Sequence, residues 1–184
     1  MADAVNSEVS IINQAINKWH QVLRGEIDFD EVLHEDCVFW SPVLFHPQEG
    51  RELTKMYLSA AALVFPGDDG VGNVDIASGD RESISFKYTK RVLSGNHAVL
   101  EFETSIDGIH VNGVDIISCD DDGLIVEFKV MIRPRQGLEK VREQMLGMIE
   151  ARDSVGVDDA AIALLGVDDD AIAWLKQEMD DSDH

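Results

Sequence analysis

One carboxylate stands inside an apolar, strand-like run of this sequence, and its surroundings make it the first candidate for chemistry. Asp115 lies within residues 111–117, where its neighbours are mainly aliphatic. Burial in such surroundings disfavours the charged form of a carboxyl group and raises its pKa by up to roughly 3–5 units. An acid of this kind donates a proton at neutral pH, or accepts one once a substrate has displaced water. The sequence therefore predicts Asp115 as a catalytic acid or base. The alternative is an aspartate that serves structure only, hydrogen-bonded by the backbone or by Tyr88.

The other reactive side chains form no second pattern. The histidines lack metal-ligand spacing, so no metal site is expected. His110 alternates away from Asp115. His46, in a predicted loop after Pro42, is either a ligand contact at a cavity mouth or, as we expect, a solvated loop residue. The sequence has no glycine-rich phosphate loop and no serine or cysteine with a suitable base. We therefore expect no cofactor and no acyl-enzyme chemistry.

The elements that must position Asp115 are predicted from hydrophobic spacing. Helical spacing covers residues 7–24, 50–65 and about 138–152, and a short helix is expected to begin at Asp28. A short strand over residues 37–40 comes before the second long helix, and alternating strands joined by Asp-Gly hairpins follow residue 84. This order predicts an α+β fold, a cone-shaped half-barrel in which a strongly curved antiparallel sheet wraps around the N-terminal helices.

Alternation assigns the strand residues to two faces. The concave face is predicted to carry Phe86, Tyr88, Leu100, Phe102, Val111, Asp115, Ile117, Val126 and Phe128. Val114 and Ile116 point the other way, and an exposed apolar stripe of this kind predicts a homodimer through the outer face of the sheet. Its charged rim is expected to comprise Lys87, Arg91, Glu101, Glu103, Glu127 and Lys129.

Two parts of the chain resemble the nuclear transport factor 2-like superfamily, most closely its SnoaL-like subgroup. The front part is residues 33–42, followed by Pro47 and Gly50 before a helix; the back part comprises residues 115–117, 120–125 and 130–134. The resemblance covers about residues 7–150 and depends on the order and spacing of these segments. It implies the cone fold, but that superfamily contains isomerases, cyclases, dehydratases, epoxide hydrolases and binding modules.

The members of this superfamily differ in the catalytic residues that accompany the position of Asp115. Ketosteroid isomerase, which holds a protonated aspartic acid in an apolar site, also resembles this chain. When the two sequences are lined up at the Asp-Gly hairpin, that neutral acid falls on Asp115. The relative's general base falls on Ser41 and its tyrosine near Lys18 and Trp19, so steroid isomerisation is not expected. The arginine of limonene-type epoxide hydrolases falls on Gly113, which argues against that chemistry. The single acid/base aspartate of SnoaL-type cyclases falls on Asp115.

These observations predict a small-molecule pocket protein. We expect an isomerase, cyclase or dehydratase that uses Asp115 as acid/base on an apolar substrate; the alternative is a non-catalytic module that binds an apolar metabolite or a protein partner. The expected pocket residues, beside Asp115, are Trp19, Trp40, Ser41, Phe86, Tyr88, Phe102, Ile117 and Phe128. The aromatic members are either simple core or part of the cavity wall.

Composition limits the partners and the compartment. The chain has 36 acidic and 15 basic residues and a net charge of −21, which disfavours nucleic acid and anionic membrane surfaces. It has no long apolar run and no secretion signal, and Cys37 and Cys119 are expected to be reduced core residues, so a cytoplasmic location is expected. We expect residues 1–152 to form the cone domain and residues 153–184 an acidic extension. A near repeat over 156–175 predicts two short helices there.

Overall fold

The computed structural model describes residues 10–64 and 85–144. Its elements in chain order are α1 (Ile11–Leu23), the 3₁₀ turn η1 (Phe29–Glu31), β1 (Leu33–Trp40), β2 (Gln48–Glu49), α2 (Arg51–Val64), β3 (Lys87–Ser94), β4 (His97–Ile106), β5 (Ile109–Cys119) and β6 (Ile125–Arg133). Residues 135–144 are also helical. The predicted acidic extension lies outside the described residues, and none of the described helices is long and apolar enough to cross a membrane.

The six strands form one curved sheet in the order β2-β1-β6-β5-β4-β3. The sheet is mixed, not wholly antiparallel as predicted, because β1 pairs in parallel with β6. Hairpins join β3, β4, β5 and β6 in succession and impose antiparallel pairing. No tight turn connects β1 to β6, because most of the described chain lies between them, so their relative direction is free to be parallel.

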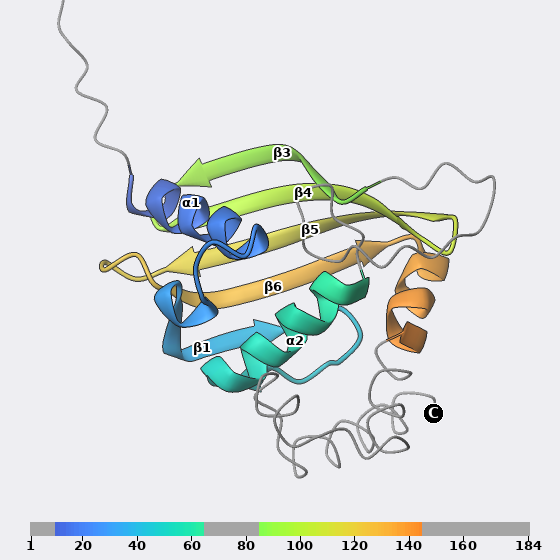
Figure 1. The fold of residues 1–184 in the computed structure, drawn as a ribbon, viewed down its shortest axis with the longest axis horizontal. Helices are drawn as coiled ribbons and strands as arrows, with labels where there is room; N and C mark the ends of the chain where they lie inside the picture. The colour runs from blue at the N-terminus through green and yellow to red at the C-terminus, as the bar shows by residue number, and fades with distance from the viewer. Residues whose placement is uncertain (1–9, 65–84, 145–184) are drawn as a thin grey trace, which may run out of the picture.

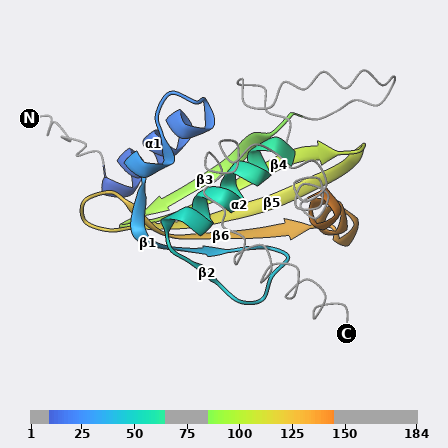
Figure 2. The same ribbon diagram turned by 60° about the horizontal axis from the view of Figure 1, so that its bottom comes forward.

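Both long helices cover the same face of the sheet. In Figure 1 both helices lie in front of the strands, and the turned view of Figure 2 shows α1 and α2 on one side of the sheet. The predicted apolar face of α1 is confirmed, since Ile12, Ile16 and Trp19 are buried. Gly25, with a φ of 68°, ends this helix as predicted. The α+β cone fold predicted from the sequence is therefore confirmed, as an open sheet and not a closed barrel.

The short helix expected from Asp28 is a single 3₁₀ turn. The predicted acidic capping box is present: the Asp28 carboxylate accepts from the Asp30 N–H, and the Glu31 side chain accepts from the Asp28 N–H. The chain then enters β1 at Leu33, four residues before the predicted start at Cys37. Leu33 is fully buried and pairs with Ile125 of β6, so burial in the sheet ends the turn early.

Two β-bulges change the predicted faces of the sheet. Val126 is an extra residue between the pairs Ser118–Glu127 and Cys119–Ile125, so Ile125 is fully buried and Val126, predicted on the concave face, is only half-buried. Of the other residues predicted for that face, Phe86 and Tyr88 are half-buried and the rest are buried.

The second bulge, at Thr89, corrects the predicted outer rim. Tyr88 pairs with Phe102, but Lys90 pairs with the next residue back, Glu101. Arg91 consequently stands opposite buried Leu100 on the inner side of β3, and its guanidinium donates to the Asn13 side chain of α1 at 3.4 Å. Arg91 was predicted to rim the outer face, and that prediction is wrong.

Candidate functional site

The concave face of the sheet and the two helices enclose a cavity of about 260 Å³. Trp19 and His20 of α1 and Tyr57 of α2 line it from the helix side, and the helical residues 135–144 contribute Val141. The strand side is mainly aromatic and aliphatic. The cavity is thus an apolar container whose few polar groups must fix the position of any ligand.

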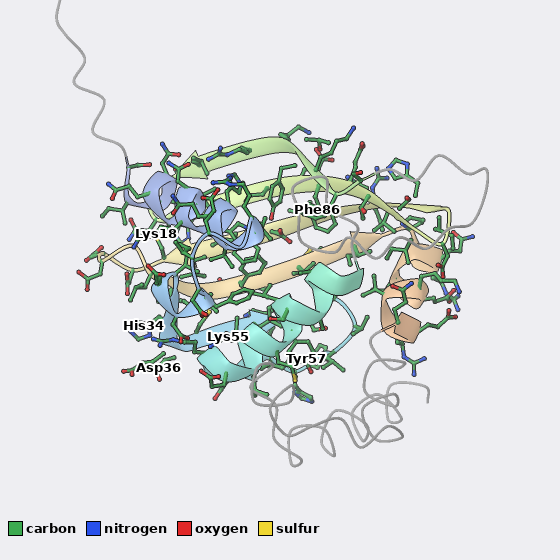
Figure 3. All side chains as sticks on the ribbon, viewed as in Figure 1. Lys18, His34, Asp36, Lys55, Tyr57 and Phe86 are labelled. Carbon is green, nitrogen blue, oxygen red and sulfur yellow. The ribbon has the colours of Figure 1, made fainter. Side chains whose placement is uncertain are left out.

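Most of the side chains singled out in the sequence meet in this cavity. Those that line it are Trp19, Ser41, Phe86, Tyr88, Phe102, Asp115 and Phe128. Phe86 and Tyr57 are labelled in Figure 3, just before β3 and on α2 respectively. Lys18, also labelled there, is exposed on α1, so its neighbour Trp19 is the residue that faces the cavity.

Two predicted pocket residues do not line the cavity. Trp40 lies on the opposite face of β1 from Phe39, and the ammonium group of Lys129 sits 4.8 Å from the centre of its ring. Since strand side chains alternate, Phe39 takes the cavity position that was predicted for Trp40. Ile117 is fully buried in the core but lies near the end of β5, the strand against which α1 packs, outside the cavity wall.

Asp115 is held by a short chain of hydrogen bonds. The Trp19 indole Nε1–H donates to the Tyr88 hydroxyl at 3.0 Å, and that hydroxyl donates to Oδ2 of Asp115 at 2.6 Å. An indole N–H can only donate, so the Tyr88 oxygen accepts from it. The hydrogen bonds therefore run from Trp19 to Tyr88 and from Tyr88 to Asp115.

Burial dominates the electrostatics of this carboxyl group. Asp115 is 5% exposed and faces Leu100 on β4 and Val130 on β6, which provide no charge. Burial raises the pKa of Asp115 to about 7, against the opposing effect of the Tyr88 hydrogen bond. Burial, and then the charge of Asp115, raise the pKa of Tyr88 well above its usual value, so the phenol remains a donor.

A second titratable group, which the sequence did not assign to the site, lines the same cavity. The His20 ring lies 5.5 Å from the Tyr88 ring, centre to centre, at an angle of 33°. Burial lowers the pKa of His20, and the charges of Arg91 and Arg24 lower it further. Its Nε2 atom is buried and has no hydrogen-bond partner among the residues described. The signal in the sequence was its position next to Trp19 on the helix.

Ser41 has a structural contact at the cavity wall, and His46 is an exposed loop residue, as expected from the sequence. The Ser41 hydroxyl is buried at the cavity wall and accepts from the Val43 N–H at 3.2 Å, so it stabilises the turn after β1. His46 lies outside the cavity lining and packs its ring against Phe45, which is 88% exposed. Within residues 10–64 and 85–144, no three His, Cys, Asp or Glu side chains are grouped to hold a metal ion.

Gly113 does not line the cavity but supports the Phe102 ring, which does. A Cβ atom at this position would lie 2.1 Å from the Phe102 ring, which packs over the glycine from the neighbouring strand. An arginine of the epoxide hydrolase type has no room here, which explains in structural terms why that chemistry does not fit.

Comparisons with known proteins support the fold. In sequence, the chain matches no family model and no curated protein. In structure it resembles a steroid delta-isomerase from Pseudomonas aeruginosa, with 28% identity, a TM-score of 0.62, and coverage of 79% of this chain and 96% of that one.

Two further structures resemble the fold. One is an uncharacterised protein with a cystatin-like fold from Silicibacter pomeroyi, at 19% identity, covering 77% of this chain and 89% of that one, with a TM-score of 0.59. The other is an NTF2-like protein of unknown function from Mesorhizobium loti, at 19% identity, covering 70% and 96%, with a TM-score of 0.52. The chain therefore has the fold of nuclear transport factor 2-like proteins, and a steroid delta-isomerase is among its structural relatives.

Proposed function

We propose that this chain is an isomerase, cyclase or dehydratase that moves protons on a small apolar substrate, with Asp115 as the acid/base group. The observation that carries the proposal is a carboxyl group with a pKa of about 7 in the wall of an apolar cavity. Catalytic groups need a pKa near the working pH, and buried perturbed acids in clefts mark functional sites more often than other carboxyl groups do.

The hydrogen bonds define which oxygen does the chemistry. Oδ2 of Asp115 accepts from Tyr88, so the acid proton resides on Oδ1. Near neutral pH a substantial fraction of the carboxyl group is protonated and can donate to a substrate oxygen. Tyr88 lowers the cost of the charged form that remains after donation. Because these steps only move protons, the proposed reaction requires no cofactor.

The likeness to a steroid delta-isomerase supports an isomerase-like proton transfer. Ser41 replaces the carboxylate that such a relative would use as base, so the shared fold alone does not lead us to propose a steroid as the substrate. The cavity of about 260 Å³ lies just below the range of roughly 300–1,000 Å³ common for drug-sized ligands, which favours a small substrate.

The direct test is turnover of two unconjugated enones, a β,γ-unsaturated cyclohexenone and a steroid carrying the same group, followed by the ultraviolet absorbance of the conjugated product. We expect turnover by the full chain and a loss of about 10²–10⁴-fold in Asp115→Asn. Asp122→Asn, in the exposed β5–β6 turn, is the matched control. Equal rates in the Asp115 variant and the unchanged protein would remove the proposed role.

The alternative function is non-catalytic binding of an apolar metabolite. It is favoured by the shortage of polar groups: Asp115 is the one carboxyl group among the described residues of the wall. In that case an apolar fluorescent probe binds the cavity, no enone is turned over, and Asp115→Asn alters affinity alone.

We propose that the chain forms a homodimer through the outer face of the sheet. The support is a group of apolar side chains on that face: Val92, Val99 and Met131 are exposed, and Val114 and Ile116 are half-buried. The charged neighbours Lys90 and Glu101 pair across β3 and β4 at 2.9 Å. A cytoplasmic location is also proposed, consistent with two buried, unpaired cysteines.

A further inference from the structure

We infer that His20 is the second proton-transfer group of the cavity, a base that works opposite Asp115 on a substrate with an acidic C–H next to a carbonyl group. This inference rests on the proposed function and identifies the base that the proposed reaction needs beside the acid Asp115. A proton shift along a carbon skeleton needs one group that takes a proton from carbon and one that stabilises the developing oxygen charge. Ser41 cannot supply the first, because its hydroxyl holds a turn.

The geometry places His20 next to the acid without direct contact. Tyr88 lies between them: its hydroxyl bonds to Asp115, and its ring packs against the imidazole. Both groups line the same cavity, one from α1 and one from β5. A substrate in this cavity would therefore lie within a wall to which both residues belong.

The state of the imidazole suits a base. Its Nε2 is buried without a hydrogen-bond partner among the described residues, which is costly unless a ligand completes it. The charged groups facing it are Arg24 from its own helix and Arg91 from β3, and with burial they lower the pKa of His20 and favour the neutral ring. In the Nδ1–H tautomer, Nε2 carries the lone pair that a base needs.

The step balances without any further reactant. His20 Nε2 takes the proton from the carbon beside the ketone, and the C–H electron pair becomes the carbon–carbon double bond of an enol. The carbonyl π pair moves to oxygen, which takes the proton from Oδ1 of Asp115. The imidazolium then gives its proton to the far carbon of the conjugated enol, while the enol oxygen returns its own proton to Asp115. The double bond has moved and both groups are restored.

This assignment makes Asp115 the acid and predicts a bell-shaped pH profile. Activity needs neutral His20 and protonated Asp115, so the rate rises as pH passes through the lowered pKa of His20 and falls as pH passes about 7. Were Asp115 the base, the rate would instead rise through pH 7.

The experiment compares His20→Gln with His110→Gln, the same change at an exposed position of β5, using the full chain and the two enones named above. We expect kcat to fall by about 10²–10⁴-fold in His20→Gln with KM nearly unchanged, loss of the acidic limb of the profile, and no effect in the control. Full activity in His20→Gln, while Asp115→Asn is inactive, overturns the inference and leaves the proposed function intact. Absence of enone turnover by the unchanged protein overturns the proposed function and this inference with it.

Nitrogen NMR of the unchanged protein provides a second readout that needs no folded variant. The His20 imidazole is expected to be neutral at pH 7 and to carry its hydrogen on Nδ1. A charged ring, or a hydrogen fixed on Nε2, would overturn the role as base.

Discussion

The Tyr88 hydroxyl sits 2.6 Å from Oδ2 of Asp115 and 3.0 Å from the indole nitrogen of Trp19, which makes one phenol both acceptor and donor in a buried chain. Three elements, α1, β3 and β5, meet in this chain. The position of the carboxyl group therefore depends on residues far from it in sequence.

Tyr88→Phe is expected to raise the pKa of Asp115 above about 7, because the removed hydrogen bond is the contact that lowers it. Leaving the Trp19 N–H unpaired should cost about 1–3 kcal/mol of the free energy of unfolding. Carbon-detected NMR titration and urea unfolding measure the two effects. In a Trp19→Phe background the stability cost should shrink; an undiminished cost would show that the two groups are not coupled.

Asp115→Asn is expected to change how stability depends on pH. The pKa of Asp115 is about 7 in the folded protein against an ordinary value of 3.8, so between these values the folded state binds a proton that the unfolded state has lost. The stability it contributes is complete below about pH 4 and is lost as pH rises through about 7. This difference corresponds to roughly 4 kcal/mol.

Urea unfolding of the two proteins from about pH 4 to 8 measures this effect. The asparagine variant should gain stability relative to the unchanged protein as pH rises. Asp122→Asn, an exposed control, should show no such trend. Parallel curves for Asp115→Asn would mean that the carboxyl group titrates at its ordinary value.

Gly113→Ala is expected to lower the free energy of unfolding by about 1–3 kcal/mol, because its methyl group would overlap the Phe102 ring. Combining it with Phe102→Leu, which shortens the overlapping side chain, should recover part of that loss relative to Phe102→Leu alone. Thermal unfolding of the four proteins gives the coupling energy. Strict additivity would contradict the close contact.

Met131→Glu is expected to shift the proposed homodimer to monomer, since it puts a charge into the outer apolar group that includes Val92, Val99 and Met131. Sedimentation velocity at micromolar concentration measures the change. Phe45→Ser, at a more exposed apolar residue in the loop after β1, is the control and should leave the assembly unchanged. A monomer before any substitution would refute the dimer.

Alternation in the strands was sufficient to predict most of the strand residues that share the cavity with Asp115, because a period of two survives wherever a strand is regular. Tyr88 was predicted as a possible hydrogen-bond partner for the same reason. The predictions for Val126 and Arg91 failed because both assumed unbroken alternation along the strand. A β-bulge interrupts the alternation at each place, and a bulge is defined by the pairing with the neighbouring strand. Trp40 was predicted to line the pocket in place of Phe39, because the sequence around β1 does not show which of the two side chains faces the cavity. That depends on the register of β1 with β6.

His20 shows a different limit. Its helical position was visible in the sequence, but its surroundings also depend on Tyr88 and Arg91, which lie far along the chain and which no local pattern connects to it. Long-range packing, not spacing, brings these groups into one electrostatic environment.

Gly113 contributes no atom to the cavity wall, yet the Phe102 ring that forms part of that wall rests on it. The width of the container is thus set by a position hidden from any bound molecule. A side chain at residue 113 would push the ring inward and narrow the cavity for a smaller substrate, while every polar group that contacts the substrate keeps its identity.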